Sequence, residues 1–415
     1  MTNTRRVALF GSFDPTFLRT RQLTELLALS GCTVCDIGNR GLAQDRVALA
    51  NKSPVSHLVL AIRLAWLNTS SSLHLLKTND LEAILVPYPG WMDLPWAAAV
   101  ARRHRIPLVF DQFISLHDTV VDDRNIVRAE SLSAKLLRAL EAKMLRHADL
   151  ILVDTEEQAD HYARKFNVER DRFVEIPLST VDPMVVRPSA PYSISDDTVD
   201  NCDSPRNVND TNQLDNLNVL YFGTYIPLHG VDVILKAAAL CSNLSIQFQL
   251  IGNGQERPRM LSLADDLNLG NVEFYDFSGV EDLAQRIGKA NVCLGVFSTS
   301  GKALRVVPTK VYESLAAGKA IVSADCASAR RLLSGAGITF VTPGDPHALA
   351  AALAELSTNR SRIAQMQTQS RDTFDARFSM TALAERMRTI VDALGRQTIA
   401  GGIACTRERD EGCRQ

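Results

Sequence analysis

The sequence has no excess of charge of either sign and no apolar run long enough to cross a membrane. Its 45 Lys and Arg residues nearly balance 47 Asp and Glu residues, for a net charge of −2. Nucleic-acid-binding proteins usually carry a basic excess, so we expect no nucleic-acid partner. The longest apolar stretch, residues 55–67, contains His57 and Arg63 and is shorter than a bilayer span. No signal peptide is expected, because Arg5 and Arg6 lead directly into a short apolar run, and the protein is expected in the cytoplasm.

Eight cysteines are spread along the chain, and we expect them to be reduced thiols. Cys32 and Cys35 have the spacing of a redox motif. They fall where the chain leaves a helix at Gly31 and enters a strand, whereas the redox motif opens a helix. Packing in the core is therefore the favoured interpretation, with redox chemistry or metal binding as the alternative.

Strand and helix patterns alternate through the first part of the chain. A protein of 415 residues is too long for one compact core, so more than one domain is expected. Continuous apolar runs are typical of parallel strands covered on both faces. They predict strands at residues 6–11, 83–88, 107–111 and 150–154, and helical spacing predicts helices at 17–29, 133–148 and 155–166. Thr155 and Gln158 are spaced as in a capping box at the start of the last helix. The pattern predicts a doubly wound α/β domain over residues 1–186.

A second α/β alternation follows a polar break. Residues 187–217 are rich in Asp, Asn, Ser and Pro and have no periodicity, which predicts a flexible linker. Strand and helix patterns resume over residues 218–378. We expect the helix at 379–395 to pack back on the first domain and the tail at 396–415 to be frayed. Because ligands of open parallel sheets bind outside the carboxyl ends of the strands, two such domains face to face would form a ligand cleft.

The segment at residues 301–325 carries the strongest chemical signal. Pro308 suits the first turn of a helix and Gly318 suits its end. Lys310 and Glu313 are three residues apart, so both lie near the helix start on the face opposite the buried stripe. The free N–H groups of a first helical turn favour an anion. The pair fits a nucleotide diphosphate, with Lys310 at the phosphates and Glu313 at the ribose hydroxyls; a surface ion pair on an ordinary helix is the alternative.

The same segment resembles the second-domain signature of the retaining glycosyltransferases of family 4, which have the GT-B fold. The family motif reads, in outline, E-x7-E-A-x-A-x-G-x-P-V, and here Glu313 is followed by Ser-Leu-Ala-Ala-Gly-Lys-Ala-Ile-Val. Residues 221–238 and 250–256 resemble the opening strand–loop–helix and the glycine turn of that domain. The resemblance implies two doubly wound Rossmann-like α/β domains facing across a cleft, and a nucleotide-diphosphate-sugar donor. The glycines that it places in the nucleotide-sugar site are Gly223, Gly252 and Gly254.

The chain departs from this family pattern at three positions. Arg305 stands where the family has its first Glu, which commonly contacts the transferred sugar. Thr224 and His229 stand where members often carry an Arg and a Lys that clamp the diphosphate. We expect Arg305 and Lys310 to supply positive charge from the opposite wall and, with His229, to stabilise the leaving diphosphate. The sugar stays open, and a non-catalytic sugar-nucleotide binder is the alternative to a hexosyltransferase-like enzyme.

The acidic pairs of the sequence do not have the pattern of metal ligands. They occur at residues 122–123, 196–197 and 265–266, and none follows a strand as a metal-chelating Asp-x-Asp would. We interpret all three as solvated surface. Helix N–H groups and cations can stabilise a leaving diphosphate without a metal, so no metal or other cofactor is expected.

Candidate acceptor-side residues lie in the first domain. Asp111 ends a predicted strand, where a base would reach the cleft, and His117 follows six residues later. Family members often have a His near this strand end, and which of the two residues is catalytic stays open. The basic run at 101–105 is interpreted as a solvated helix end, with contact to an anionic membrane or a lipid phosphate as the alternative. The acceptor is expected to be a glycan, a lipid-linked molecule or a small molecule. A lipid-linked acceptor would place the protein at the inner membrane face.

Residues 11–15, Gly-Ser-Phe-Asp-Pro, match the turn that opens nucleotidylyltransferases. That family continues with H-x-G-H, whose histidines hold the nucleotide phosphates, and other residues occupy both histidine positions here. The missing histidines and the donor signature in a second domain favour the glycosyltransferase interpretation. In GT-B enzymes this loop borders the cleft, so Gly11 is expected at the nucleotide-sugar site, with Arg19 and Arg21 adding cations.

Overall fold

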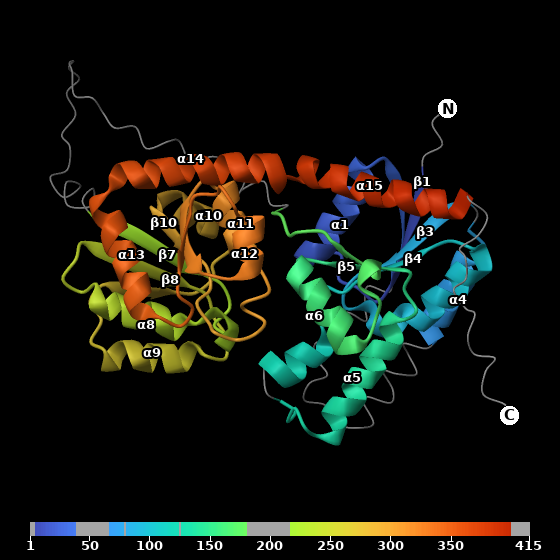
Figure 1. Cartoon of the computed structure of the whole chain (residues 1–415), viewed down its shortest axis with the longest axis horizontal. Helices are drawn as coiled ribbons and strands as arrows, with labels where there is room; N and C mark the ends of the chain where they lie inside the picture. Colours follow the sequence, from blue (N-terminus) through green and yellow to red (C-terminus); the bar gives the residue numbers. More distant parts are fainter. Residues whose placement is uncertain (1–4, 39–65, 79, 124–125, 181–215, 400–415) are drawn as a thin grey trace, which may run out of the picture. The chain divides into compact units, whose positions relative to one another are not determined.

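The computed structural model describes residues 5–38, 66–78, 80–123, 126–180 and 216–399, which form two compact units (Figure 1). Unit 1 consists of residues 1–177 and 380–415, and unit 2 consists of residues 178–379. The C-terminal helix thus belongs to unit 1. The expected domain boundary at 186 and most of the expected linker lie outside the described residues. Over the ranges given above, no helix has the length and apolar character needed to cross a membrane.

Unit 1 is built on a six-stranded parallel sheet with the strand order β2-β1-β3-β4-β5-β6. The strands are β1 (Arg5–Gly11), β2 (Cys32–Gly38), β3 (Leu81–Val86), β4 (Leu108–Asp111), β5 (Leu150–Val153) and β6 (Phe173–Glu175). The chain forms β2 on one side of β1 and β3 on the other, so the strand order reverses between β1 and β3. Ligands of open α/β sheets bind at such a reversal, outside the carboxyl ends of the strands.

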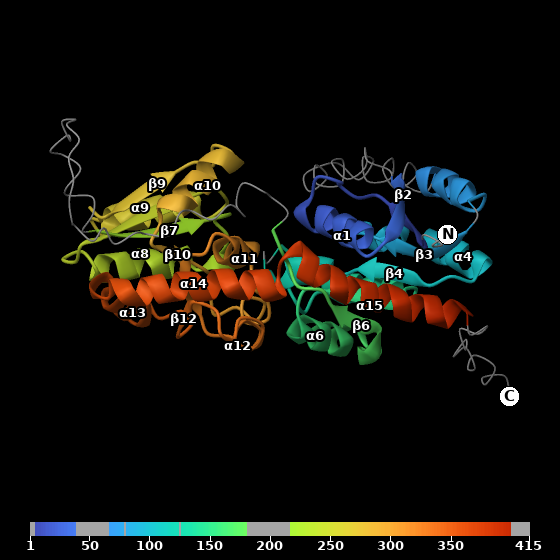
Figure 2. The same ribbon diagram turned by 90° about the horizontal axis from the view of Figure 1, so that it is seen from above.

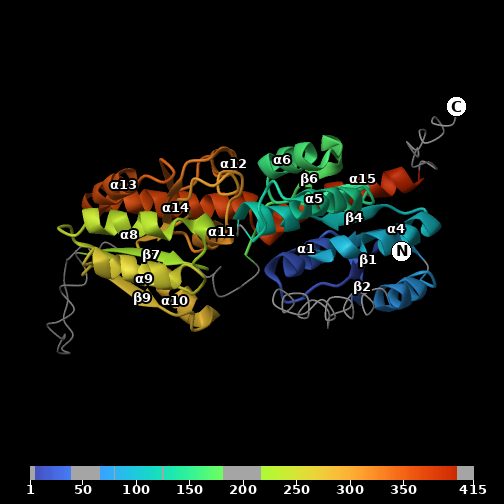
Figure 3. The same cartoon turned by 90° about the horizontal axis from the view of Figure 1, so that it is seen from below.

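Alternate side chains of the sheet in unit 1 face two helical layers. On β1, Val7 and Leu9 pack with side chains of α1 and α15, whereas Ala8 and Phe10 face α4, α5 and α6. These helices are α1 (Leu18–Leu29), α4 (Leu94–His104), α5 (Leu132–Leu145), α6 (Glu156–Phe166) and α15 (Met380–Ile399), and α5 lies beside α6 (Figure 3). α15 continues past the predicted helix end at residue 395. Burial on both faces explains why the strands are continuous apolar runs in the sequence.

The two closely spaced cysteines lie in β2 as free thiols. Cys32 is buried in the core of unit 1, and burial raises its pKa. Cys32 and Cys35 are three residues apart in a strand, so their side chains point to opposite faces of the sheet. This placement fits the packing interpretation and opposes a shared redox or metal site.

Unit 2 has a second six-stranded parallel sheet, with the order β12-β11-β10-β7-β8-β9. Its strands are β7 (Leu217–Phe222), β8 (Ile246–Ile251), β9 (Val272–Tyr275), β10 (Val292–Leu294), β11 (Ala320–Ala324) and β12 (Ile338–Val341). Its helices are α8 (Val231–Leu240), α9 (Arg257–Asp266), α10 (Val280–Lys289), α11 (Thr309–Ala316), α12 (Ala327–Leu332), α13 (Pro346–Thr358) and α14 (Arg360–Arg377), with α8 and α13 side by side (Figure 2). The strand order reverses between β7 and β10, which directs attention to the loops that follow these two strands.

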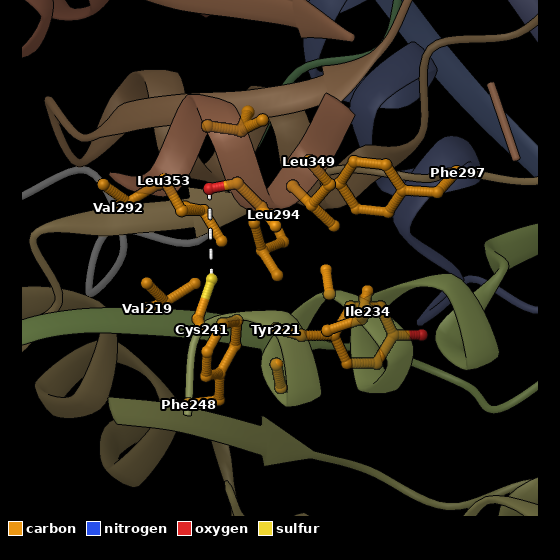
Figure 4. Close-up of a cluster of buried hydrophobic side chains, with 14 of the residues drawn as sticks. Val219, Tyr221, Ile234, Cys241, Phe248, Val292, Leu294, Phe297, Leu349 and Leu353 are labelled. Carbon is orange, nitrogen blue, oxygen red and sulfur yellow. Dashed lines mark hydrogen bonds between the residues drawn. The ribbon is translucent and has the colours of Figure 1, made fainter. Parts of the chain in front are cut away.

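The larger core of unit 2 reaches the loop that follows β7. Val219 and Tyr221 of β7 pack there with Ile234 of α8 and Leu353 of α13. Figure 4 shows the Tyr221 ring at the edge of this cluster, with its hydroxyl group pointing away from the aliphatic side chains. The core therefore holds the ring while the polar end is directed out of it.

Candidate functional site

Two glycine loops meet at the carboxyl edge of the sheet in unit 2. Gly223 follows β7 and Gly252 follows β8, and the Gly223 N–H donates to the Ile251 carbonyl at 3.0 Å. The two glycines have φ angles of 138° and 131°. A Cβ on Gly252 would lie 2.1 Å from the Gly223 carbonyl oxygen, so this approach requires glycine. Gly254 approaches the Tyr225 backbone in the same way, so the structure brings the three predicted glycines together.

The ammonium group of Lys310 lies against the first of these loops. Lys310 is 5% exposed. Its Nζ lies 4.0 Å from the centroid of the Tyr221 ring and 3.4 Å from Nδ1 of His229. A Cβ on Gly223 would lie 2.9 Å from this Nζ, so a larger residue would displace the lysine. No carboxylate of the described residues forms an ion pair with Lys310. A buried cation without a carboxylate partner, beside a backbone loop at the reversal of the sheet, favours an anionic ligand.

His229 uses one ring nitrogen within the protein. Its Nδ1 lies 2.5 Å from the Thr224 carbonyl oxygen. A carbonyl only accepts hydrogen bonds, so Nδ1 carries the proton and Nε2 of the neutral ring is an acceptor. Burial, reinforced by the Lys310 charge, lowers the pKa of His229 to about 2. Burial also holds the pKa of Lys310 well below its ordinary value, although the Glu313 carboxylate opposes this shift. His229 is therefore neutral in this geometry, and its protonated Nδ1 cannot accept a hydrogen bond from the Lys310 ammonium. Its expected role in stabilising the leaving diphosphate stays a prediction.

Local sequence fixes the ends of α11, which carries Lys310. The helix begins directly after Pro308, as predicted. At its end Gly318 has a φ of 61°, and its N–H donates to the Leu315 carbonyl at 2.9 Å. The next N–H, of Lys319, donates to the Ser314 carbonyl at 3.0 Å, which completes a Schellman motif.

The face of α11 that carries Lys310 is not a solvent face. Val311 and Leu315 form a buried stripe, but Lys310 and Tyr312 are buried as well. Glu313, one turn after Lys310, is partly exposed. The alternative of a surface ion pair is therefore wrong, because Lys310 is not at the surface.

Arg305 lies in the connection between β10 and α11. A Cβ on Gly301 would lie 3.0 Å from Nη1 of Arg305, which places the guanidinium beside the turn that precedes it. This connection is joined to the loop after β7, because the Phe297 N–H donates to the His229 carbonyl at 3.0 Å. Arg305 thus lies in the connection that leads into the helix of Lys310, and only for Lys310 does the structure give contacts with the Gly223 loop.

At the sheet reversal of unit 1, a buried carboxylate closes the loop after β1. The Ser12 N–H donates to Oδ2 of Asp93 at 2.8 Å, and Nδ2 of Asn68 donates to its Oδ1 at 2.6 Å. Gly11 has a φ of 107°, and a Cβ there would lie 2.7 Å from Oδ2 of Asp93. Gly11 therefore makes room for Asp93, and its contact with a nucleotide sugar stays a prediction.

Asp111 pairs with Arg19 inside unit 1. Both side chains are fully buried, and Nε of Arg19 donates to Oδ1 of Asp111 at 3.1 Å. Nη1 of Arg19 donates to the Ile176 carbonyl at 2.7 Å. Burial raises the pKa of Asp111, and the Arg19 charge opposes this shift. Oδ2 of Asp111 and Nη2 of Arg19 lack hydrogen-bond partners in the described part of the chain. Arg19, expected to offer a cation to a ligand, is instead part of the interior.

Three partly exposed aromatic rings lie next to this ion pair. Phe17 follows β1, Tyr88 follows β3 and Phe113 follows β4, with ring centroids 5.6 to 5.9 Å apart. The Arg19 guanidinium lies 5.7 Å from the centroid of the Phe113 ring. The rings come from loops after three neighbouring strands and so gather at the carboxyl edge of the sheet.

His117 lies in a cluster of charged side chains. The backbone N–H of His117 donates to Oε2 of Glu141 at 2.9 Å, and its ring Nδ1 lies 4.0 Å from Oδ2 of Asp122. Lys165 pairs with Asp118 and, at 2.7 Å, with Asp122. Burial lowers the pKa of His117, and the Lys165 charge lowers it further. His117 is therefore a neutral side chain in an ion-pair cluster.

The same cluster contains a group of side chains that could hold a metal ion. The ligand atoms of His117, Asp118 and Asp122 lie within 4.8 Å of one another. Lys165 already pairs with both carboxylates, so a metal ion at this cluster would have to compete with its ammonium group. Asp122 is thus a member of an ion-pair cluster and more than solvated surface, while independence from metal stays a prediction.

Glu141 is a buried residue that sequence analysis did not identify. It accepts hydrogen bonds from the Ser115 hydroxyl at 3.1 Å and the His117 N–H at 2.9 Å, and so holds the loop that follows β4. Glu141 lies seven residues after the buried Ala134 and four before the buried Leu145. A carboxylate on the buried face of a helix was the signal that could have identified it.

Two family models match the chain. The model described as glycosyl transferase 4-like domain matches residues 19–179, and the model described as glycosyl transferases group 1 matches residues 216–359. No curated protein sequence matches the chain.

Solved structures of glycosyltransferases share the fold. Sucrose-phosphate synthase from Thermosynechococcus elongatus has a TM-score of 0.67 and 18% identity, with 96% of this chain and 100% of that chain covered. HepE of Anabaena, solved in complex with UDP, has a TM-score of 0.61 and 15% identity, with 94% and 100% covered. The lipopolysaccharide outer core galactosyltransferase WaaB has a TM-score of 0.59 and 13% identity, with 94% and 99% covered. The chain therefore belongs to the family-4-like glycosyltransferases, with two Rossmann-like α/β units of the GT-B fold.

Proposed function

We propose that the chain is a retaining, hexosyltransferase-like enzyme that transfers a sugar from a nucleotide-diphosphate sugar to an acceptor. The observation that carries the proposal is the Lys310 ammonium, which is buried without a carboxylate partner against Gly223. A protein with a similar fold binds a nucleotide sugar: HepE of Anabaena has been solved in complex with UDP-glucose. The donor diphosphate would supply the anion that Lys310 lacks.

The donor-site side chains take different roles in this proposal. Lys310 donates to the diphosphate and stabilises the negative charge that grows on it as the sugar–phosphate bond breaks. His229, neutral and with Nε2 as an acceptor, suits a donor hydroxyl better than a phosphate. Glu313, one turn further along α11, accepts hydrogen bonds from the ribose. Arg305 adds positive charge from the connection before α11, and no metal ion or other cofactor takes part.

The acceptor side of the proposal rests on unit 1. Asp111 at the end of β4 and His117 in the following loop are the candidate catalytic groups. The buried pair with Arg19 means that Asp111 must become exposed before it can act on a substrate. We propose a glycan, a lipid-linked molecule or a small molecule as the acceptor.

A reducing compartment suits the cysteines of the chain. Cys32, Cys35, Cys241, Cys293 and Cys326 are free thiols. Disulfides form in oxidising compartments, so free thiols support our proposal that the protein acts in the cytoplasm.

Donor hydrolysis tests the proposal without knowledge of the acceptor. The protein is incubated with a panel of UDP-, GDP- and dTDP-sugars, and free nucleoside diphosphate is measured, with Lys310→Met and Lys319→Met as paired variants. We expect slow hydrolysis of one donor, lost in Lys310→Met and kept in Lys319→Met. Tight binding without any hydrolysis would favour the second candidate, a non-catalytic sugar-nucleotide binder, which the burial of Asp111 supports. If the protein showed no binding and no hydrolysis of any donor, both candidate functions would be overturned.

A further inference from the structure

α5 carries leucines that its own unit leaves uncovered. Leu132, Leu136 and Leu140 are 81%, 67% and 40% exposed. Residues four apart lie on one face of a helix, so the three form a row along α5, which is about 21 Å long. Ile126, in the turn that leads into the helix, is 66% exposed. We call these four residues the α5 stripe; its most exposed members are at the start of the helix.

Packing of α5 on its unit does not explain the stripe. The buried face of the helix includes Ala134, Glu141 and Leu145. The helix therefore places a carboxylate inside, where it holds the loop after β4, and a row of leucines outside. Single exposed leucines are normal in a protein surface, but a contiguous apolar row marks an interaction site. Figure 1 shows α5 along the lower margin of its unit.

Exposed cations flank the α5 stripe. Lys135 follows Leu132 by three residues, and Lys143 follows Leu140 by three residues. Arg128 precedes the helix, Arg146 ends it, and all four cations are exposed. In the parts of the chain that the structure describes, none of them forms an ion pair. Long Lys and Arg side chains can lay their apolar stems beside inserted leucines and keep their charges at a polar surface.

We propose that the α5 stripe binds the surface of an anionic lipid bilayer. A helix with an apolar row and flanking Lys and Arg residues can lie in the interface of a membrane, where the cations meet anionic headgroups. Charge complementarity selects this occupant over a second copy of the chain, because two α5 stripes face to face would bring like charges together. The site differs from the basic run at 101–105 that sequence analysis considered, and it is independent of the proposed donor site.

Vesicle sedimentation tests the proposal with the full chain. The protein is mixed with vesicles of phosphatidylcholine alone or of equal parts phosphatidylcholine and phosphatidylglycerol. We expect sedimentation with the anionic vesicles and little with the neutral ones, and release as NaCl screens the charges. Leu132→Ser/Leu136→Ser is expected to lower the bound fraction by about tenfold or more, because both leucines would insert into the interface. Lys135→Glu/Lys143→Glu is expected to lower binding to anionic vesicles only.

A matched control comes from exposed leucines elsewhere. Leu240→Ser/Leu244→Ser removes two exposed leucines of unit 2 and should leave vesicle binding unchanged. Thermal unfolding checks that each variant folds. Absence of binding to either vesicle, or equal binding by the parent and Leu132→Ser/Leu136→Ser, would overturn the proposal. A concentration-dependent dimer of the parent that this variant loses, seen by sedimentation velocity, would assign the stripe to a second copy instead.

Discussion

Replacing Lys310 with Met is expected to stabilise the protein and to weaken nucleotide-diphosphate binding at once. Met keeps much of the apolar length of Lys without its charge. The contacts of the Lys310 ammonium are the Tyr221 ring at 4.0 Å and the protonated Nδ1 of His229 at 3.4 Å. Burial of a polar group without a partner costs about 1–3 kcal/mol and more for a charge, whereas a cation–π contact returns about 0.5–2 kcal/mol. We expect a gain on the order of 1 kcal/mol, or about 2–4 °C in Tm.

The pH dependence of this gain has a defined sign. Lysine in an unfolded chain titrates near pH ~10.4, and burial lowers the pKa of Lys310 in the folded protein. A base with a lowered folded pKa destabilises the fold at every pH below its unfolded pKa, because folding must bury the charge or release the proton. The gain from Lys310→Met should therefore be full below the folded pKa. It should decline as the pH rises above that value and be absent above about 10.4.

Binding is expected to change in the opposite direction. Loss of a hydrogen bond to a charged group costs about 1.5–3 kcal/mol, so we expect Lys310→Met to lose roughly 10- to 150-fold in affinity. Calorimetry with UDP and other nucleoside diphosphates measures this loss. Lys319→Met is the matched control, because Lys319 is also buried but its Nζ donates to the Gly288 carbonyl at 2.7 Å. That variant should lose stability and keep its affinity. Unchanged affinity in Lys310→Met, or a loss of stability like that of Lys319→Met, would refute the reasoning.

Three further predictions concern the same site. Gly223→Ala should lower nucleoside-diphosphate affinity, because its Cβ would lie 2.9 Å from Nζ of Lys310; Gly335→Ala, with a φ of 84° and open space around its Cβ, should lose stability only. Equal affinities of the two variants by calorimetry would contradict the contact. Glu313→Ala should weaken nucleoside-diphosphate binding by about 1.5–3 kcal/mol with little change in Tm, and unchanged affinity would exclude a ribose contact. EDTA should leave donor hydrolysis within about twofold, and a loss of activity restored by Mg²⁺ or Mn²⁺ would show that a metal takes part.

Local sequence predicts the elements of this fold well and the placement of its charges poorly. The run at 107–111 predicts β4, and Pro308 and Gly318 predict the ends of α11, because local patterns decide both. Arg19 and Asp111 are 92 residues apart, and their fully buried pair depends on which strands become neighbours. No spacing rule encodes that arrangement. Lys310 was identified by its motif, but its burial follows from contact with a loop much earlier in the chain.

Tyr221 makes the hydrophobic core and the candidate donor site inseparable. Its ring packs in the core of unit 2 and lies under the Lys310 ammonium, and its hydroxyl lies 2.9 Å from Nδ1 of His229. Core positions ordinarily tolerate exchange among apolar residues of similar volume. Here such an exchange would also change the electrostatic surroundings of Lys310 and the hydrogen bonding of His229. We therefore expect a substitution at Tyr221 to change both the stability of this core and the affinity of the candidate donor site.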